Sequence, residues 1–258
     1  MLYEFHGYRS NILNSATEPT ALSIQALLLW NEVLGEKAVP AIEKGISWLL
    51  KYMNTACLWG PIKKREKYGY IYFSCVVLRC LHRLLNFSQV GIKASLVFKV
   101  RSALESGCRS LLSAFNNNDT QCGWGATQNG RVTLFHTAYA ILTLLEIDSE
   151  YAKKHPIIKS LAFLSDYIEN PPLENAMRDR LNDGMNEIYQ NKTNRLVYTH
   201  SVDVYILLAL LYGYREKNKP TIIEKCKFYI EVIDKDLETA EKRCDAYYKA
   251  LTSLLKIK

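Results

Sequence analysis

The stretch from Gln121 to Ile147 constrains the fold more than any other part of the sequence. It begins with a Gly-Trp-Gly turn, continues through a polar loop, and ends in an apolar segment with helical periodicity that opens on Thr137. Three other places in the chain follow the same plan, with segments that begin at Thr20, Ser74 and Ser201. Because these starts are separated by 54, 63 and 64 residues, the sequence predicts an internal helical repeat.

The segments before these starts also correspond. Each start is preceded by a turn that carries an aromatic residue: His6-Gly7-Tyr8, Leu58-Trp59-Gly60, Gly123-Trp124-Gly125 and Glu187-Ile188-Tyr189. Two of the turns follow similar helical segments, EKGISWLLKYM from Glu43 and ESGCRSLLSAF from Glu105. The predicted unit is therefore an outer helix, an aromatic turn and an inner helix. Units of this kind bury their apolar faces by stacking on their neighbours.

Helical periodicity covers most of the chain. The pattern predicts helices over residues 21–34, 40–53, 72–87, 92–115, 137–147, 156–168, 200–215, 220–233 and 237–257, with one short helix within 173–189. Thr20 is in the position of a cap for the first helix, although Pro19 can also open a helix in its first turn. We find no convincing run of alternating strand pattern, so the sequence predicts an all-α protein. Residues 1–258 form one predicted domain of about four to five helical hairpins.

Composition narrows the class of protein. Of the 258 residues, 48% are hydrophobic and 23% are charged, which is typical of a soluble globular chain. The seven cysteines form no Cys-x-x-Cys pair, and the first ten residues do not resemble a secretion signal, so we expect reduced thiols and a cytoplasmic location. The most apolar run carries Asp203 and is too short to span a membrane. The net charge of +7 is spread along the chain, and we expect no nucleic-acid partner.

The repeat resembles the terpenoid cyclase and protein prenyltransferase superfamily, whose domains are α/α toroids. In that family a Lys/Arg-Gly stretch leads to a Gly-x-Trp turn in the so-called QW motif. The segments from Lys44-Gly45 to Trp59 and from Gly107 to Trp124 are similar to it. The resemblance implies an α/α toroid and a hydrophobic, isoprenoid-like ligand. Another helical repeat, or an α/α barrel of the glycosidase type, remains the alternative fold.

The acid that cyclases of this family use is not found at its usual places. The resemblance implies an Asp-rich motif directly before an inner helix, but Thr133 to His136 before Thr137 contain no carboxylate. Ahead of Thr20, Glu18 takes the middle position of that motif. Glu18 is therefore the candidate proton donor. The alternative is that it only stabilises the N-terminus of its helix.

The zinc site of the prenyltransferases is also incomplete. His136, within Phe135-His136-Thr137-Ala138-Tyr139, is similar to the histidine ligand of that family. The resemblance implies an Asp-x-Cys pair of ligands one repeat earlier, but there the sequence has Cys75 without an aspartate before it. A catalytic zinc site needs three protein ligands. We therefore expect no metal and no cofactor, and we interpret His136 as a polar residue at the rim of the ligand cavity.

Further candidates lie on the inner helices. His200 and Asp203 are three residues apart on one helix face, where they form either a cavity-lining acid–base pair or a buried polar contact. Tyr72, Tyr139, Tyr205 and Trp124 are predicted to line the ligand cavity. Such rings suit a cavity that stabilises a cation, and they are equally ordinary as core residues with a polar tip.

The number of helices predicts an incomplete ring. The complete toroid of the family has six helix pairs, whereas the pattern here predicts about nine long helices, and the turn at Gly7-Tyr8 follows no outer helix. An open ring exposes apolar flanks on its terminal helices, which predicts binding to another protein or to a second copy.

Three functions follow from these patterns. In the first, the toroid binds an isoprenoid-like ligand or a protein partner without the chemistry of the family. In the second, the chain is a terpene cyclase or a prenyltransferase-type enzyme, or one subunit of a split enzyme, that uses a displaced acid such as Glu18 or Asp203. In the third, it is a helical scaffold for protein–protein interaction.

Overall fold

The computed structural model describes residues 16–30, 34–61, 69–87, 91–118, 121–169 and 202–214. The chain divides into two compact units after Gly213, and all described residues except Tyr214 belong to the first. In the described ranges, no helix has both the length and the apolar character needed to cross a membrane. The helices predicted over 173–189, 220–233 and 237–257 lie outside the described residues.

Seven α-helices contain most of the described residues. The inner helices of the predicted units are α1 (Thr17–Leu29), α4 (Ile71–Asn86), α6 (Leu134–Ile147) and α10 (Val202–Tyr214), and the outer ones are α3 (Val39–Lys51), α5 (Ala94–Ser113) and α7 (His155–Glu169). Short 3-10 helices, η1 (Gly35–Ala38) and η2 (Ser149–Lys153), precede α3 and α7. Helices account for 74% of the described residues, which confirms the all-α class.

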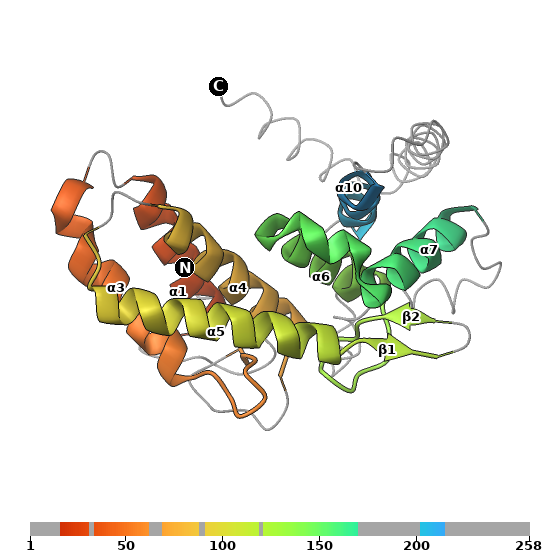
Figure 1. Cartoon of the computed structure of the whole chain (residues 1–258), viewed down its shortest axis with the longest axis horizontal. Helices are drawn as coiled ribbons and strands as arrows, with labels where there is room; N and C mark the ends of the chain where they lie inside the picture. The colour runs from red at the N-terminus through yellow and green to blue at the C-terminus, as the bar shows by residue number, and fades with distance from the viewer. Residues whose placement is uncertain are drawn as a thin grey trace, which may run out of the picture. The chain divides into compact units, whose positions relative to one another are not determined.

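The helices pack in the order of the chain (Figure 1). The inner helix α4 contacts α1 on one side and α6 on the other, and the outer helix α3 contacts α5. Contacts between α1 and α3, α4 and α5, and α6 and α7 join inner helices to outer ones. Twelve side chains of α6 and eleven of α4 are buried, whereas α3 buries only Ile42, Ile46 and Leu49. The core therefore lies on and around α4 and α6.

One hydrogen bond recurs in the first turn of three inner helices. The hydroxyl of Thr20 donates to the carbonyl of Ala16 at 2.7 Å, that of Ser74 to Tyr70 at 2.7 Å, and that of Thr137 to Thr133 at 2.6 Å. These donors are the residues at which the sequence aligns the repeat. A hydroxyl that donates to the carbonyl four residues back satisfies its own hydrogen-bonding group while the backbone stays helical.

The turns before α4 and α6 share a second arrangement. The backbone N–H of Trp59 donates to Ser74 Oγ at 3.0 Å, and that of Trp124 donates to Thr137 Oγ1 at 3.0 Å. Both indole rings are fully buried. The indole N–H of Trp59 donates to the Leu49 carbonyl at 2.8 Å, and that of Trp124 to the Leu111 carbonyl at 2.6 Å. Each tryptophan thus joins the last turn of an outer helix to the first turn of the next inner helix.

Small residues let the outer helices approach the inner ones. A Cβ at Gly45 of α3 would lie 2.9 Å from Ile24 Cδ1 of α1, and a Cβ at Gly107 of α5 would lie 2.6 Å from Leu78 Cδ2 of α4. Ile24 and Leu78 each lie four residues after the recurring hydroxyl. Helix α7 has Ser160 at the corresponding place; it is fully buried, and its hydroxyl has no hydrogen-bond partner among the described residues.

Several helices begin at residues other than those predicted. Helix α1 begins at Thr17 rather than residue 21, so Pro19 lies in its first turn and Thr20 is not its cap. Helix α6 begins three residues before Thr137 because Thr133 caps it and accepts a hydrogen bond from the His136 N–H. The loop after α5 contains two short antiparallel strands, β1 (Asn116–Asn117) and β2 (Cys122–Gly123), with Asn116 paired to Gly123. Two-residue strands are too short to show an alternating pattern.

Candidate functional site

Aromatic side chains from the inner helices α4, α6 and α10 form one cluster. The ring of Tyr72 lies 5.2 Å from that of Tyr139 and 5.8 Å from that of Phe135. The ring of Tyr205 lies 5.4 Å from each of the same two rings. Three of the predicted cavity residues, Tyr72, Tyr139 and Tyr205, are therefore brought together. Phe135 is a fourth member that the sequence placed only beside His136.

The candidate acid reaches this cluster from α1. The Tyr72 hydroxyl donates a hydrogen bond to Glu18 Oε1 at 2.5 Å, across 54 positions of sequence. Burial, followed by the hydrogen bond to Glu18, raises the pKa of Tyr72. Tyr72, Tyr139 and Phe135 are at most 8% exposed, whereas Glu18 and Tyr205 are half-buried. A ligand at this cluster would first meet Glu18 and Tyr205.

Arg79 of α4 is a member of the site that sequence reasoning missed. Its guanidinium carbon lies 5.7 Å from the centre of the Tyr139 ring, and its Nε lies 2.5 Å from Glu146 Oε2 of α6. Burial opposes the charge of Arg79, but Tyr139 and Glu146 outweigh burial, and the pKa of Arg79 is raised. Burial raises the pKa of Tyr139 to about 12, although Arg79 acts in the opposite direction.

A second arginine extends this polar cluster to α1. Arg83 Nη2 lies 3.2 Å from Glu146 Oε1, and Arg83 Nη1 donates to Gln25 Oε1 at 2.6 Å. The available signal was a pair of arginines four residues apart in a largely apolar inner helix. Their carboxylate partner lies 63 residues beyond Arg83, so spacing alone could not supply it.

His136 and Trp124 have contacts of a structural kind. His136 is 1% exposed, and its Nδ1 lies 2.8 Å from the hydroxyl of Thr133, the cap of α6. Burial lowers the pKa of His136 to about 3, so the imidazole is neutral near pH 7. Trp124 is fully buried, bonds the Leu111 carbonyl and packs 5.4 Å from the ring of Phe115. These contacts account for both residues without a ligand.

The second predicted pair lies largely beyond the described part of the chain. His200 is outside the described residues, and Asp203 falls within α10 at a position whose side chain is not described. A contact between them therefore stays a prediction. In the described ranges, no three His, Cys, Asp or Glu side chains are grouped as metal ligands would be.

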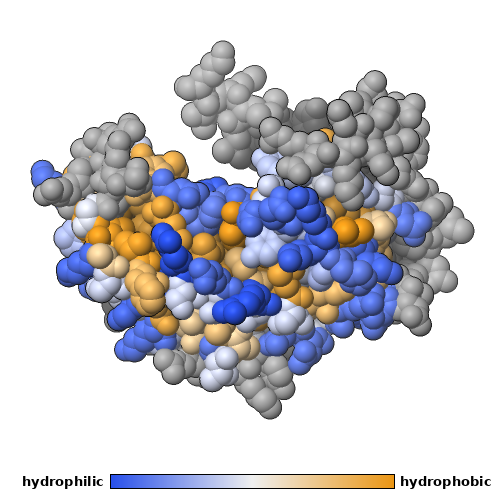
Figure 2. Space-filling view, in the orientation of Figure 1, coloured by the Kyte–Doolittle hydropathy of each residue, from blue (hydrophilic) through white to orange (hydrophobic). Residues whose placement is uncertain are grey.

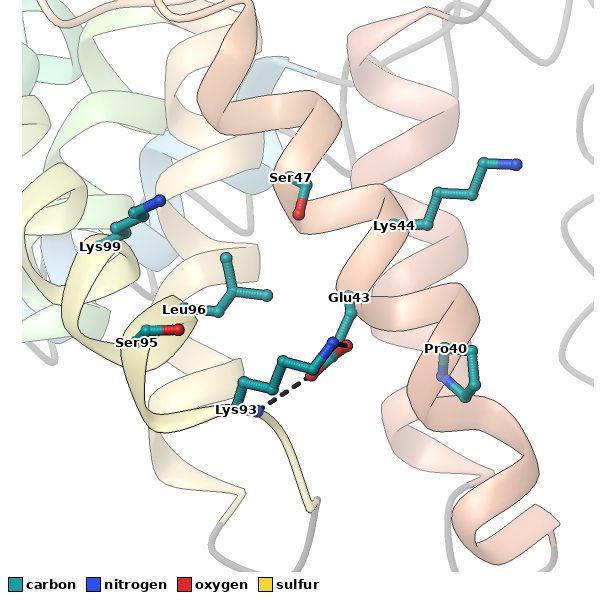
Figure 3. Close-up of a pocket in the computed structure, with 8 residues that line it drawn as sticks. All are labelled: Pro40, Glu43, Lys44, Ser47, Lys93, Ser95, Leu96 and Lys99. Carbon is teal, nitrogen blue, oxygen red and sulfur yellow. Dashed lines mark hydrogen bonds and ion pairs between the residues drawn. The ribbon is translucent and has the colours of Figure 1, made fainter.

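A solvent-open groove separates the outer helices α3 and α5 (Figure 3). Its walls carry Pro40, Glu43, Lys44 and Ser47 from α3, and Lys93, Ser95, Leu96 and Lys99 from the start of α5. Glu43 already bridges it: Oε1 accepts the Lys93 N–H at 3.0 Å, and Oε2 lies 3.2 Å from Lys93 Nζ. The hydrogen bond from the Lys93 backbone lowers the pKa of Glu43. The groove is thus an ion-paired contact between two helices.

Helix α1 leaves an apolar face uncovered. Leu22 is 51% exposed, Leu29 70% and Trp30 61%, and Ala26 between them is also exposed. We call these four residues the α1 stripe. Their spacing puts them on one side of the helix. Figure 2 shows hydrophobic surface at the left of the view, where Figure 1 places α1 and α3.

The corresponding faces of the next two inner helices are covered. Counted from the recurring hydroxyls, Leu22 and Ala26 correspond to Val76 and Cys80 of α4, which are 4% and 0% exposed. On α6 they correspond to Tyr139 and Thr143, and Tyr139 contacts Tyr72 of α4. The next two inner helices, α4 and α6, therefore bury these two positions, and α1 exposes them.

Comparison of the chain with protein-family models, with curated proteins and with solved structures finds no match.

Proposed function

We propose that this chain is a helical-repeat protein, built as an α/α toroid of the terpenoid cyclase and prenyltransferase kind, that binds a protein partner through the α1 stripe. The observation that carries the proposal is the exposure of Leu22 and Trp30, whose counterparts in α4, Val76 and Leu84, are both 4% exposed. Contiguous exposed apolar surface on a folded protein often marks an interaction site. The proposed role needs no catalytic residue, in keeping with the incomplete cyclase and zinc motifs of the sequence.

A photo-crosslinking residue in place of Leu29 tests this function in cells. Phe98 on α5 is the matched control position, since it is a large apolar side chain 74% exposed outside the stripe. We expect a protein adduct from position 29 and none from position 98. No adduct at position 29, or the same adduct from both positions, would rule out a binding role for the stripe.

The aromatic cluster supports a second candidate function, the binding of a hydrophobic, isoprenoid-like ligand. Glu18, Tyr72, Tyr139 and Tyr205 converge there from four inner helices. Aromatic faces beside a carboxylate suit an apolar molecule with cationic character. Because Glu18 Oε1 accepts the hydrogen bond from Tyr72, only Oε2 is left to carry a proton for donation. Binding is therefore favoured over catalysis at this cluster.

Native mass spectrometry of the freshly purified chain tests the second candidate. We expect an added mass in the isoprenoid or lipid range that disappears in Tyr205→Ala, because Tyr205 lies at the exposed side of the cluster. Tyr52→Ala is the control, since Tyr52 packs on Trp48 of the outer helix α3, with their rings 4.7 Å apart. A mass equal to that of the chain alone argues against a bound ligand.

A further inference from the structure

We propose that the partner seated on the α1 stripe is a second copy of this chain, with α1 packed antiparallel against α1 of the other copy. The inference rests on the proposed use of the stripe as an interface, and it names the occupant. Three properties of α1 favour this occupant: the face that is left open, the absence of charged residues from Pro19 to Trp30, and the order of large and small side chains.

The open face has the form of a helix-packing surface. In α6, the face that corresponds to the stripe contacts α4 through Tyr139 and Glu146, which meet Tyr72 and Arg79. In α4, the corresponding face reaches α1 through Arg83 and Gln25. The repeat therefore uses this face to receive a neighbouring helix. A helix is the kind of element that would cover it on α1.

The lack of charged residues along the α1 stripe favours an apolar partner. From Pro19 to Trp30 the helix has no charged residue, so it fits an equally uncharged surface, and a second α1 provides one. The corresponding positions on α4 and α6 are charged at one end, where Arg83 and Glu146 stand in place of Leu29. Two copies of α1 can approach along the stripe without repulsion between like charges on their facing surfaces, despite a net charge of +7 on each chain.

The order of side chains makes the stripe complementary to itself. Ala26 stands at its centre, with Leu22 four residues before it and Trp30 four residues after it. A twofold axis at Ala26 sets Leu22 of each copy against Trp30 of the other and brings the two small residues together. Two helices approach closely where small residues meet, and a two-fold interface pairs one patch with itself. Trp30 is the expected anchor, since tryptophan is enriched among residues that dominate binding.

The size of the stripe sets the expected affinity. One helix face buries less than the roughly 800 Å² per partner of a standard interface. We therefore expect a dimer that dissociates on dilution, with a dissociation constant on the order of micromolar.

Sedimentation velocity of the purified full chain over a concentration series tests the dimer. We expect the wild type to shift from monomer to dimer as concentration rises, and Leu29→Glu to remain monomeric while its circular dichroism stays that of the wild type. Phe98→Glu, which adds the same charge to an exposed apolar position on α5, should dimerise as the wild type does. A wild type that stays monomeric throughout overturns the proposal, as does a dimer that Leu29→Glu leaves intact.

A short bismaleimide tests the placement of Ala26 at the twofold axis. Ala26→Cys should give a covalent dimer, and the wild type with its seven native cysteines, treated in the same way, should not. Equal cross-linking of both proteins contradicts the placement of Ala26 at the axis. If the wild type is monomeric but the crosslinker at position 29 traps a different protein in cells, the second copy is refuted while the proposed function of the stripe survives.

Discussion

The indole N–H groups of Trp59 and Trp124 each bond a carbonyl in the last turn of an outer helix. Carbonyls in that turn have few partners within their own helix: the Leu49 carbonyl also accepts the Tyr52 N–H, at 3.3 Å. We predict that Trp59→Phe and Trp124→Phe each lower the free energy of unfolding by about 1–3 kcal/mol, the cost of leaving a buried polar group unsatisfied. Urea denaturation measures both losses. Trp30→Phe is the control, since Trp30 is 61% exposed, and a loss there of similar size would contradict the role of the buried pair.

Glycine is required at two places on the outer helices because of the side chains opposite. We predict that Gly107→Ala destabilises the fold, since its Cβ would lie 2.6 Å from Leu78 and 3.3 Å from the Trp59 ring. Gly45→Ala should cost less, because its nearest contact, the Ile24 methyl at 2.9 Å, is longer and its three nearest atoms include no ring or backbone atom. On an open helix face the same change would stabilise by about 1 kcal/mol. In thermal denaturation, Gly107→Ala should have a lower melting temperature than Gly45→Ala. Gly91→Ala, with open space around its Cβ, should melt at the temperature of the wild type.

His136 makes the stability of the fold depend on pH. Its pKa is about 3 in the folded chain, and an exposed imidazole titrates near about 6.5. Between those values the unfolded chain binds a proton that the folded chain does not, so acid favours unfolding. We predict that this contribution is complete above about pH 6.5 and is lost as the pH falls towards 3, by at most about 1.4 kcal/mol per pH unit. The free energy of unfolding, measured at about pH 4 to 7 where that loss occurs, should depend less steeply on pH in His136→Gln than in the wild type. Parallel curves would show that His136 titrates normally.

At the scale of elements, the apolar periodicity predicted all seven described helices. It placed α3, α4 and α7 within two residues of their observed ends, because their buried faces and boundary residues agree. It missed the first turn of α1 and of α6, where the hydroxyls of Thr20 and Thr137 donate to the carbonyls of the cap residues four positions back. A hydroxyl near a helix start indicates a cap in sequence, and only the backbone shows that the helix has already begun.

The sequence predicted only part of the candidate site, because it indicates helix faces and not the contacts between them. The three tyrosines could be placed on one inner surface because each stands near the start of an inner helix. The bond between Glu18 and Tyr72 and the pairing of Arg79 with Glu146 join residues that are 54 and 67 positions apart, and their side-chain geometry decides them. Periodicity assigns a residue to a helix face, but it does not choose the residue that the face meets.

Between α4 and α6, one carboxylate holds two arginines. Glu146→Gln removes the partner of Arg79 and Arg83, whose ion pairs are partly shielded from solvent. We predict a loss of about 1–2 kcal/mol in unfolding free energy, because hydrogen bonds to charged groups are stronger than neutral ones and partial exposure reduces their effect. Glu150→Gln, which breaks the exposed pair with Lys153, should cost less than about 0.5 kcal/mol. Urea denaturation compares the two variants. Equal losses would mean that the cluster contributes no more than a surface ion pair.

At the scale of the whole molecule, each repeat is stabilised by the neighbours on which it stacks. Helix α4 packs between α1 and α6 and buries eleven side chains, whereas α1 buries four and exposes its stripe. A unit that lacks contacts on one side opens at a lower free energy than the units inside the stack. The two helices should therefore differ in stability within one cooperative fold.

Hydrogen exchange followed by mass spectrometry measures that difference. We predict that amides of α1, such as those of Ile24 and Leu28, exchange faster than those of Val77 and Leu81 in α4, although all four side chains are at most 2% exposed. Since a partner on the stripe supplies the missing contacts, raising the protein concentration should slow exchange in α1 and leave α4 unchanged. Leu29→Glu should remove this concentration dependence while preserving the faster exchange of α1. Equal protection of α1 and α4 at low concentration would show that the uncovered face costs the helix no stability.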